Sequence, residues 1–160
     1  MTHGMTWLAF MTDTSGSRVV YLWRAYLAVI LGTMLVAVMA VLVIPQPEPG
    51  ASSPPPPIVG FALIWPAAST LMLWGILEVT RRLTPTYWHA AGAAMLVFTA
   101  LFSLAAGLDG GLMFGWGYLF YALTFLAWQL RSNLDGFLMT YTLQASVHLT
   151  LSLFVFPDPV

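Results

Sequence analysis

The chain of 160 residues is long enough for one domain, and 59% of its residues are hydrophobic while only 7% are charged. Soluble proteins carry roughly 25% charged residues, so this composition, with a mean hydropathy of +0.84, places most of the chain in a lipid bilayer. A net charge of −1 and only five cations, all arginine, exclude the basic surface that nucleic-acid binding requires. The absence of cysteine excludes disulfides, thiolate metal sites and cysteine nucleophiles.

Five apolar stretches follow the N-terminal residues 1–18, which are predicted to be a tail or a short helix in the membrane interface. A hydrocarbon core about 30 Å thick requires roughly 20 apolar residues, because a helix rises about 1.5 Å per residue. The first stretch is longer than the hydrophobic region of a cleaved signal peptide, roughly 7–15 residues, so we expect it to be retained. The sequence predicts an all-α integral membrane protein with a membrane domain over 19–156, a bundle of five transmembrane helices at about 19–44, 58–77, 87–106, 112–130 and 137–156.

The fifth stretch carries polar side chains at alternate positions, a period of two residues that is typical of a strand. A single strand cannot cross lipid, because its backbone N–H and C=O groups would be unpaired in hydrocarbon. We therefore expect a helix. On a helix, four of these side chains lie four residues apart and form one polar stripe, which we expect protein to surround: Thr140, Gln144, His148 and Ser152.

The arginines predict the orientation of the bundle, because positive charge is retained on the cytoplasmic side of short loops. Arg18 and Arg24 precede or open the first span. Arg81 and Arg82 follow the second span, and Arg131 follows the fourth. With five spans and a cytoplasmic N-terminus, all five arginines lie inside and the tail 157–160 is exterior. The predicted location is the bacterial inner (plasma) membrane.

The connections and span ends carry further signals. Segment 45–57 has seven prolines in thirteen residues and is predicted to be a stiff, extended exterior loop. The glycine-rich segment 107–111 is predicted to turn the third span back against the fourth, and Gly111 and Gly115 would let the two backbones approach closely. Aromatic side chains near the predicted span ends are expected to anchor the helices at the headgroups: Tyr21, Trp23, Tyr87, Trp88, Trp116, Tyr118 and Trp128.

Pro66 lies inside the second span and cannot donate a backbone hydrogen bond, so it predicts a kink or a free carbonyl. Ser69 and Thr70 follow it, and hydroxyls beside a free carbonyl could bind water or a cation. We favour a kink that serves packing alone.

His148 falls near the middle of the fifth span, where its imidazole needs a partner. We expect a structural hydrogen bond, and the alternatives are proton transfer or axial ligation of a haem or pigment. A haem held by two histidines would need a second deep histidine, whereas His3 lies in the tail and His89 at the surface. No cofactor and no metal site is therefore predicted.

A charge cluster is predicted at the inner interface. Glu78 ends the second span, Arg81 and Arg82 lie within about one helical turn of it, and His89 opens the third span across a short loop. The cluster is expected to be an ion pair that fixes the hairpin, and the alternative is a site for an anion, a lipid headgroup or a proton.

These features favour a non-catalytic accessory or scaffolding subunit of a larger inner-membrane complex, in contact with membrane lipids and other integral membrane subunits. The spans hold few titratable groups, and an exterior rich in aromatic residues and methionine suits burial against other subunits. The first alternative is a small-solute or proton channel or transporter, in which the polar stripe lines a path with Glu78 at its inner mouth.

The second alternative is an intramembrane enzyme that uses Glu78 and the histidines. The spacing of Glu78, Arg81 and Arg82 is similar to a motif of CAAX-type intramembrane proteases. That motif pairs two adjacent glutamates, whereas the neighbour here is Leu77, and the histidine motifs of that family are absent. No family is assigned on this basis.

Overall fold

The computed structural model describes residues 10–44, 57–84 and 86–154, and all regular structure in these ranges is helical. The elements are α1 (Arg18–Val43), the π-helical turn η2 (Gly60–Ile64), α2 (Trp65–Leu83), α3 (Tyr87–Gln129) and α4 (Asn133–Phe154). The prediction of an all-helical chain is confirmed, and the last stretch is a helix despite its alternating pattern. Three stretches are long and apolar enough to cross a membrane: Arg18–Val43, Gly60–Leu83 and Tyr87–Gln129.

Several helix ends differ from the predicted spans. The second helix does not stop at Leu77 but continues through the charged residues to Leu83. The stop is set by Pro85, because the residue before a proline avoids helical geometry, and Thr84 is extended, with φ −133° and ψ 107°. The Thr84 hydroxyl completes this end by donating to the Thr80 carbonyl at 2.8 Å.

The last helix begins at Asn133, earlier than the predicted 137, because Ser132 caps it. The Ser132 hydroxyl oxygen accepts a hydrogen bond from the Asp135 backbone N–H at 2.9 Å, and the hydroxyl donates to the Asp135 carboxylate at 2.8 Å. The first of these bonds satisfies one of the orphan N–H groups of the helix start, and the second holds the serine hydroxyl in place. The predicted tail 157–160, and the proline-rich loop except for Pro57, lie outside the described residues.

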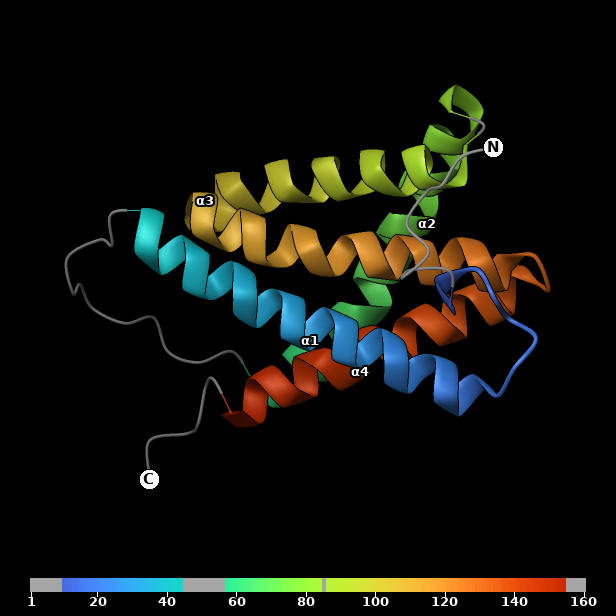
Figure 1. Ribbon diagram of the computed structural model, residues 1–160, viewed down its shortest axis with the longest axis horizontal. Coiled ribbons are helices and arrows are strands. Elements are labelled where there is room, and N and C mark those ends of the chain that lie inside the picture. Colours follow the sequence, from blue (N-terminus) through green and yellow to red (C-terminus); the bar gives the residue numbers. More distant parts are fainter. Residues whose placement is uncertain (1–9, 45–56, 85, 155–160) are drawn as a thin grey trace.

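α3 consists of two helical segments, 87–106 and 108–129, that meet at Gly107. Gly107 has φ 84° and ψ 169°, a backbone region that is essentially restricted to glycine. The two segments lie side by side and antiparallel (Figure 1), so the turn predicted over 107–111 is confined to one residue. A Cβ on Gly111 or Gly115 would lie 1.9 Å from a side-chain oxygen of the facing segment, so these glycines permit the close approach.

Aromatic rings fill the space between the two segments of α3. The rings of Phe98 and Tyr118 stack with centroids 3.6 Å apart, and those of Phe102 and Phe114 stack at 4.5 Å. Tyr118 was expected at the headgroups as an anchor, but only 1% of it is exposed, because the stack with Phe98 holds it inside the bundle. Stacked aromatic pairs stabilise such a hairpin by about 0.5–1.5 kcal/mol beyond the area that they bury.

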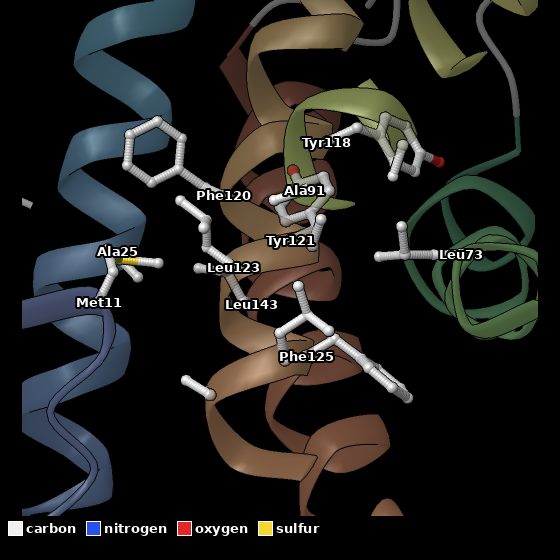
Figure 2. Close-up of a cluster of buried hydrophobic side chains, with 14 of the residues drawn as sticks. Met11, Ala25, Leu73, Ala91, Tyr118, Phe120, Tyr121, Leu123, Phe125 and Leu143 are labelled. Carbon is white, nitrogen blue, oxygen red and sulfur yellow. The ribbon is translucent and has the colours of Figure 1, made fainter. Parts of the chain in front are cut away.

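Segment 108–129 and α4 form the centre of the bundle, and α1 and α2 each pack against both α3 and α4. Figure 2 shows the buried apolar cluster along α3, with Leu73 of α2 on one side and Met11 and Ala25 on the other. Gly32 of α1 lets the Trp116 side chain approach, and the Trp116 Nε1 donates to the Ala28 carbonyl at 3.3 Å. The outer faces of α1, α2 and α3 are covered with exposed leucine, valine and methionine, which suits contact with lipid.

Residues 10–17, the described part of the predicted tail or interfacial helix, pack against one end of the bundle. Met11 is fully buried, and its carbonyl accepts a hydrogen bond from the Tyr21 hydroxyl at 3.2 Å. Ser15 donates to the Asp13 carboxylate through its hydroxyl at 2.6 Å and its backbone N–H at 2.9 Å. These hydrogen bonds to the charged form lower the pKa of Asp13 below its usual value.

Charged side chains join the helix ends beside this segment. Arg18 at the start of α1 forms an ion pair with Asp135 at the start of α4, at 2.6 Å. Two guanidinium groups lie over the buried ring of Trp128, that of Arg18 at 5.5 Å and that of Arg131 at 4.8 Å from the ring centroid. Arg131 also donates to the Thr14 carbonyl. These contacts place the starts of α1 and α4 and the end of α3 together, and we call this end of the bundle the arginine end.

Candidate functional site

The predicted polar stripe of α4 lies inside the protein. Thr140 and Gln144 are fully buried, and His148 and Ser152 are 2% and 5% exposed. On other faces of α4, Ser146 is exposed and donates to a carbonyl of its own helix, whereas Thr150 is half-buried, and its hydroxyl donates to the Ser146 carbonyl and lies 2.7 Å from the Tyr26 hydroxyl of α1. The sequence therefore identified a polar stripe whose members share one buried helix face, and protein surrounds it as expected.

The second helix supplies a partner for this stripe. The Ser69 hydroxyl donates to Gln144 Oε1 at 2.5 Å and lies 3.3 Å from the Pro66 carbonyl oxygen, which also accepts from the Thr70 hydroxyl at 2.7 Å. Pro66 lacks an N–H, and the helix accommodates it with the π turn η2, in which the Trp65 N–H reaches the Gly60 carbonyl. Of the two hydroxyls after Pro66, that of Ser69 links α2 to the stripe, and that of Thr70 bonds within its own helix.

A hydrogen bond fixes the tautomer of the neutral His148 ring. Its Nδ1 lies 2.8 Å from the Gln144 backbone carbonyl oxygen. Because a carbonyl oxygen can only accept, Nδ1 carries the hydrogen in the neutral ring, and Nε2 has a free lone pair. The ring packs edge-on against Phe61, with centroids 4.8 Å apart. Nε2 is therefore a buried proton acceptor whose tautomer is set by the fold.

Four buried polar atoms of this region have no hydrogen-bond partner within the described structure: Tyr118 Oη, Thr140 Oγ1, Gln144 Nε2 and His148 Nε2. Together they offer both kinds of hydrogen-bonding group, since the Gln144 amide donates, the His148 Nε2 accepts, and the two hydroxyls do either. An unpaired buried polar group costs about 1–3 kcal/mol, and buried polar groups in proteins are generally paired with protein or water. Four such atoms in one region indicate a site for water or for a small polar species.

A small cavity adjoins His148. Its volume is about 40 Å³. It is lined by residues of α1, α3 and α4, namely Val29, Thr33, Met113, Phe114, Gly117, Tyr121, Val147, His148 and Leu151. A water molecule needs about 10–15 Å³ of such volume, whereas a drug-sized ligand occupies a pocket of about 300–1,000 Å³. The cavity beside His148 therefore has room for water and is much smaller than a pocket for a drug-sized ligand.

The predicted charge cluster divides into separate contacts. Glu78 forms an exposed ion pair with Arg82 at 3.1 Å. Arg81 instead donates to Gln129 Oε1 of α3 at 2.8 Å, which no local pattern indicated. His89 is exposed, and within the described chain no hydrogen bond or ion pair connects it to the other three side chains.

The Glu78 carboxylate lies apart from the polar stripe. Its carboxylate is exposed beside Arg82, whereas His148 is buried in the second half of α4. The residues described contain no group of three histidine, aspartate or glutamate side chains that could hold a metal ion. Glu78 and His148 therefore do not lie in one site that could activate a water.

The comparisons leave the site to be interpreted from its geometry. No family model, curated protein or solved structure matches this chain. The fold and the site together define a helical bundle with apolar helices compatible with a membrane, enclosing a buried polar stripe around His148.

Proposed function

We propose that this chain is an integral membrane protein that moves protons through the polar stripe of α4, with His148 as the proton-carrying group. The observation that carries the proposal is the buried Nε2 of His148, an acceptor whose tautomer is fixed by the Gln144 carbonyl and which has no hydrogen-bond partner among the described residues. A neutral imidazole in this state can take a proton at Nε2 and return it from the same atom, while Nδ1–H stays on the carbonyl.

The spacing of the stripe suits a chain of water molecules. Side chains four residues apart on a helix are separated by about 6 Å along its axis, and one water with two hydrogen bonds of about 2.8 Å each spans that distance. From Thr140 to Ser152 the stripe covers about 18 Å of a hydrocarbon core about 30 Å thick. Hydroxyl, amide and imidazole groups at these positions both donate and accept, as proton transfer between waters requires.

The size of the cavity selects the transported species. A volume of about 40 Å³ beside His148 holds water but no solute of several heavy atoms. Of the two transported species considered for the channel or transporter, a small solute and a proton, the cavity therefore favours the proton. No part of this proposal uses Glu78, whose carboxylate is exposed and paired with Arg82.

The proposal includes a five-span topology, with the N-terminus in the cytoplasm and the C-terminus outside, in a bacterial inner membrane. It is supported by the antiparallel halves of α3, which with α1, α2 and α4 make five helical segments of alternating direction. It is also supported by the contacts of Arg18 with Asp135 and of Arg81 with Gln129, which gather four helix ends at the arginine end. Clustered arginines favour the cytoplasmic side.

Proton flux into liposomes tests this function. The purified protein is reconstituted with a pH-sensitive dye inside, and a potassium diffusion potential drives protons inward. We expect flux above that of protein-free liposomes, and we expect His148→Gln to abolish the excess, because glutamine keeps polarity but carries no proton at neutral pH. The matched control is Ser146→Ala on the exposed face of the same helix. Equal flux for wild type and protein-free liposomes would refute the proposal.

A second function, the accessory subunit of a membrane complex, is favoured by one specific feature. An apolar groove of about 550 Å³ lies between α1 and α3, lined by α1 residues such as Leu35 and Met39 and by Leu96 and Trp116 of α3. A transmembrane helix of a partner subunit could pack there by van der Waals contact. Purification in mild detergent, followed by mass spectrometry, tests it: a stoichiometric partner protein lost on Leu35→Trp supports this function, and an unaccompanied chain opposes it.

A further inference from the structure

A second polar pocket lies at the arginine end and is separate from the stripe of α4. It has a volume of about 340 Å³. Four helix ends meet around it: Arg81 and Thr84 come from the end of α2, Tyr87 from the start of α3, Gln129 from the end of α3 and Asn133 from the start of α4. Because helix ends lie at the boundary of the hydrocarbon core, the pocket lies at the depth of lipid phosphates.

The charge of this pocket is set by Arg81. Arg82 is paired with Glu78, and Arg18 is paired with Asp135. Arg81 has no carboxylate within ion-pair distance among the described residues and makes one hydrogen bond, from Nη1 to Gln129 Oε1. A guanidinium has five N–H donors, so most of its donors are available to an anion in the pocket.

Amide groups hold the guanidinium in place. Gln129 accepts from Arg81 through Oε1 at 2.8 Å and donates through Nε2 to Asn133 Oδ1 at 3.1 Å. This chain from α2 through α3 to α4 fixes Arg81 over the pocket and leaves the amide N–H groups of Asn133 as further donors. The donors match the oxygens of a phosphate, for which arginine is the preferred partner.

One wall of the pocket is apolar. Leu126, Leu130 and Ala90 line it beside the polar groups, and Leu130 is largely exposed. A free inorganic anion gains nothing from such a wall, whereas a phospholipid places its phosphate on the cation and its glycerol and acyl carbons on the leucines. Cation and apolar wall together are the two halves of a lipid site.

We infer that this pocket binds the phosphodiester of an anionic phospholipid, with Arg81 as the cation that selects negative charge. Phosphatidylglycerol is the simplest lipid of this class, and phosphatidylcholine, whose net charge is zero, is the reference. The inference rests on embedding in a membrane and not on proton movement at His148. It would hold even if the protein carried no flux.

Native mass spectrometry of the delipidated protein, titrated with phosphatidylglycerol or phosphatidylcholine in detergent, tests the inference. We expect one phosphatidylglycerol to bind about fivefold more tightly than phosphatidylcholine, since one arginine near anionic lipid contributes about 1 kcal/mol. Arg81→Gln should remove this preference, and Arg81→Lys should keep most of it because the charge remains. The matched control is Arg82→Gln, which removes the same charge one residue away but outside the pocket.

Three results would overturn the inference. Equal loss with Arg82→Gln would show a diffuse effect of surface charge, and equal affinities of the wild type for the two lipids would show no selection. Competition by millimolar inorganic phosphate or glycerol phosphate would identify a free anion rather than a lipid as the ligand. Arg81→Lys preserves the charge. If this variant still binds phosphatidylglycerol, position 81 tolerates substitution, and the loss in Arg81→Gln is due to the missing charge rather than to unfolding.

Discussion

Replacing Gln144 with leucine separates a hydrated polar stripe from a dry one, because the two states predict opposite signs for the change in stability. Leucine is similar in volume but removes both polar atoms of the amide. In the structure Oε1 accepts from Ser69 at 2.5 Å, and the buried Nε2 has no hydrogen-bond partner in the part of the chain that the structure describes. The free energy of unfolding therefore depends on whether water satisfies Nε2.

The magnitudes follow from these two atoms. In a dry stripe, the unpaired amide nitrogen costs about 1–3 kcal/mol, and the Ser69 hydrogen bond contributes only about 0.6 and at most about 1.7 kcal/mol between membrane helices. Gln144→Leu would then stabilise the protein by about 1 kcal/mol. In a hydrated stripe the amide is already satisfied, so the substitution forfeits the Ser69 hydrogen bond and strands the neighbouring water. We predict a destabilisation of about 1 kcal/mol.

Unfolding by sodium dodecyl sulfate in mixed micelles, followed by the fluorescence of the seven tryptophans, measures this difference. Ser146→Ala is the matched control, since its hydroxyl is exposed and bonds its own helix, and it should change the free energy by less than about 0.5 kcal/mol. A Gln144→Leu protein that is more stable than wild type would refute the hydrated stripe, and with it the proton path.

Other perturbations test separate parts of the structure. Gly107→Ala should lower the free energy of unfolding by about 1–3 kcal/mol in the same assay, because alanine is strained at φ 84°. Gly75→Ala should not destabilise the protein, because a Cβ added there meets open space. Equal effects of the two substitutions would contradict the one-residue turn. In the liposome assay Glu78→Gln should leave proton flux near the wild-type level, because the Glu78 carboxylate is exposed and away from the stripe, whereas His148→Ala should remove the flux. A larger loss with Glu78→Gln would contradict the assignment of His148 as the proton-carrying group. A phosphatase reporter fused to the C-terminus should be active, because that end is expected on the exterior side of the inner membrane, and a reporter in the loop after α2 should be cytoplasmic. A cytoplasmic C-terminus would contradict the five-span topology.

The sequence predicted the features that depend on neighbouring residues, such as helix formation and the spacing of the polar stripe. α4 is a helix, as expected despite its period of two, with Thr140, Gln144 and His148 on one buried face. α2 continues past Leu77, the end of the predicted apolar span, to Leu83, because the proline that follows Thr84 sets the stop. A short stretch of charge does not unwind a helix, whereas a proline does.

Contacts between distant residues could not be predicted from local patterns. Ser69 meets Gln144 across two helices, and Arg81 meets Gln129 rather than Glu78, because packing of the bundle decides both. Tyr118 was expected at the headgroups, since a tyrosine near a span end usually lies there. It is buried because the hairpin turns at Gly107 and stacks its ring on Phe98.

The central claim is that His148 Nε2 is an unprotonated acceptor in contact with water inside the membrane. Solid-state nitrogen-15 NMR of histidine-labelled protein in lipid bilayers tests it directly, with the His148→Gln protein to assign the signal among the three histidines. We predict a neutral ring protonated at Nδ1, with magnetisation transferred to Nε2 from water protons. A ring protonated at Nε2, or an Nε2 that receives no magnetisation from water, would contradict the account.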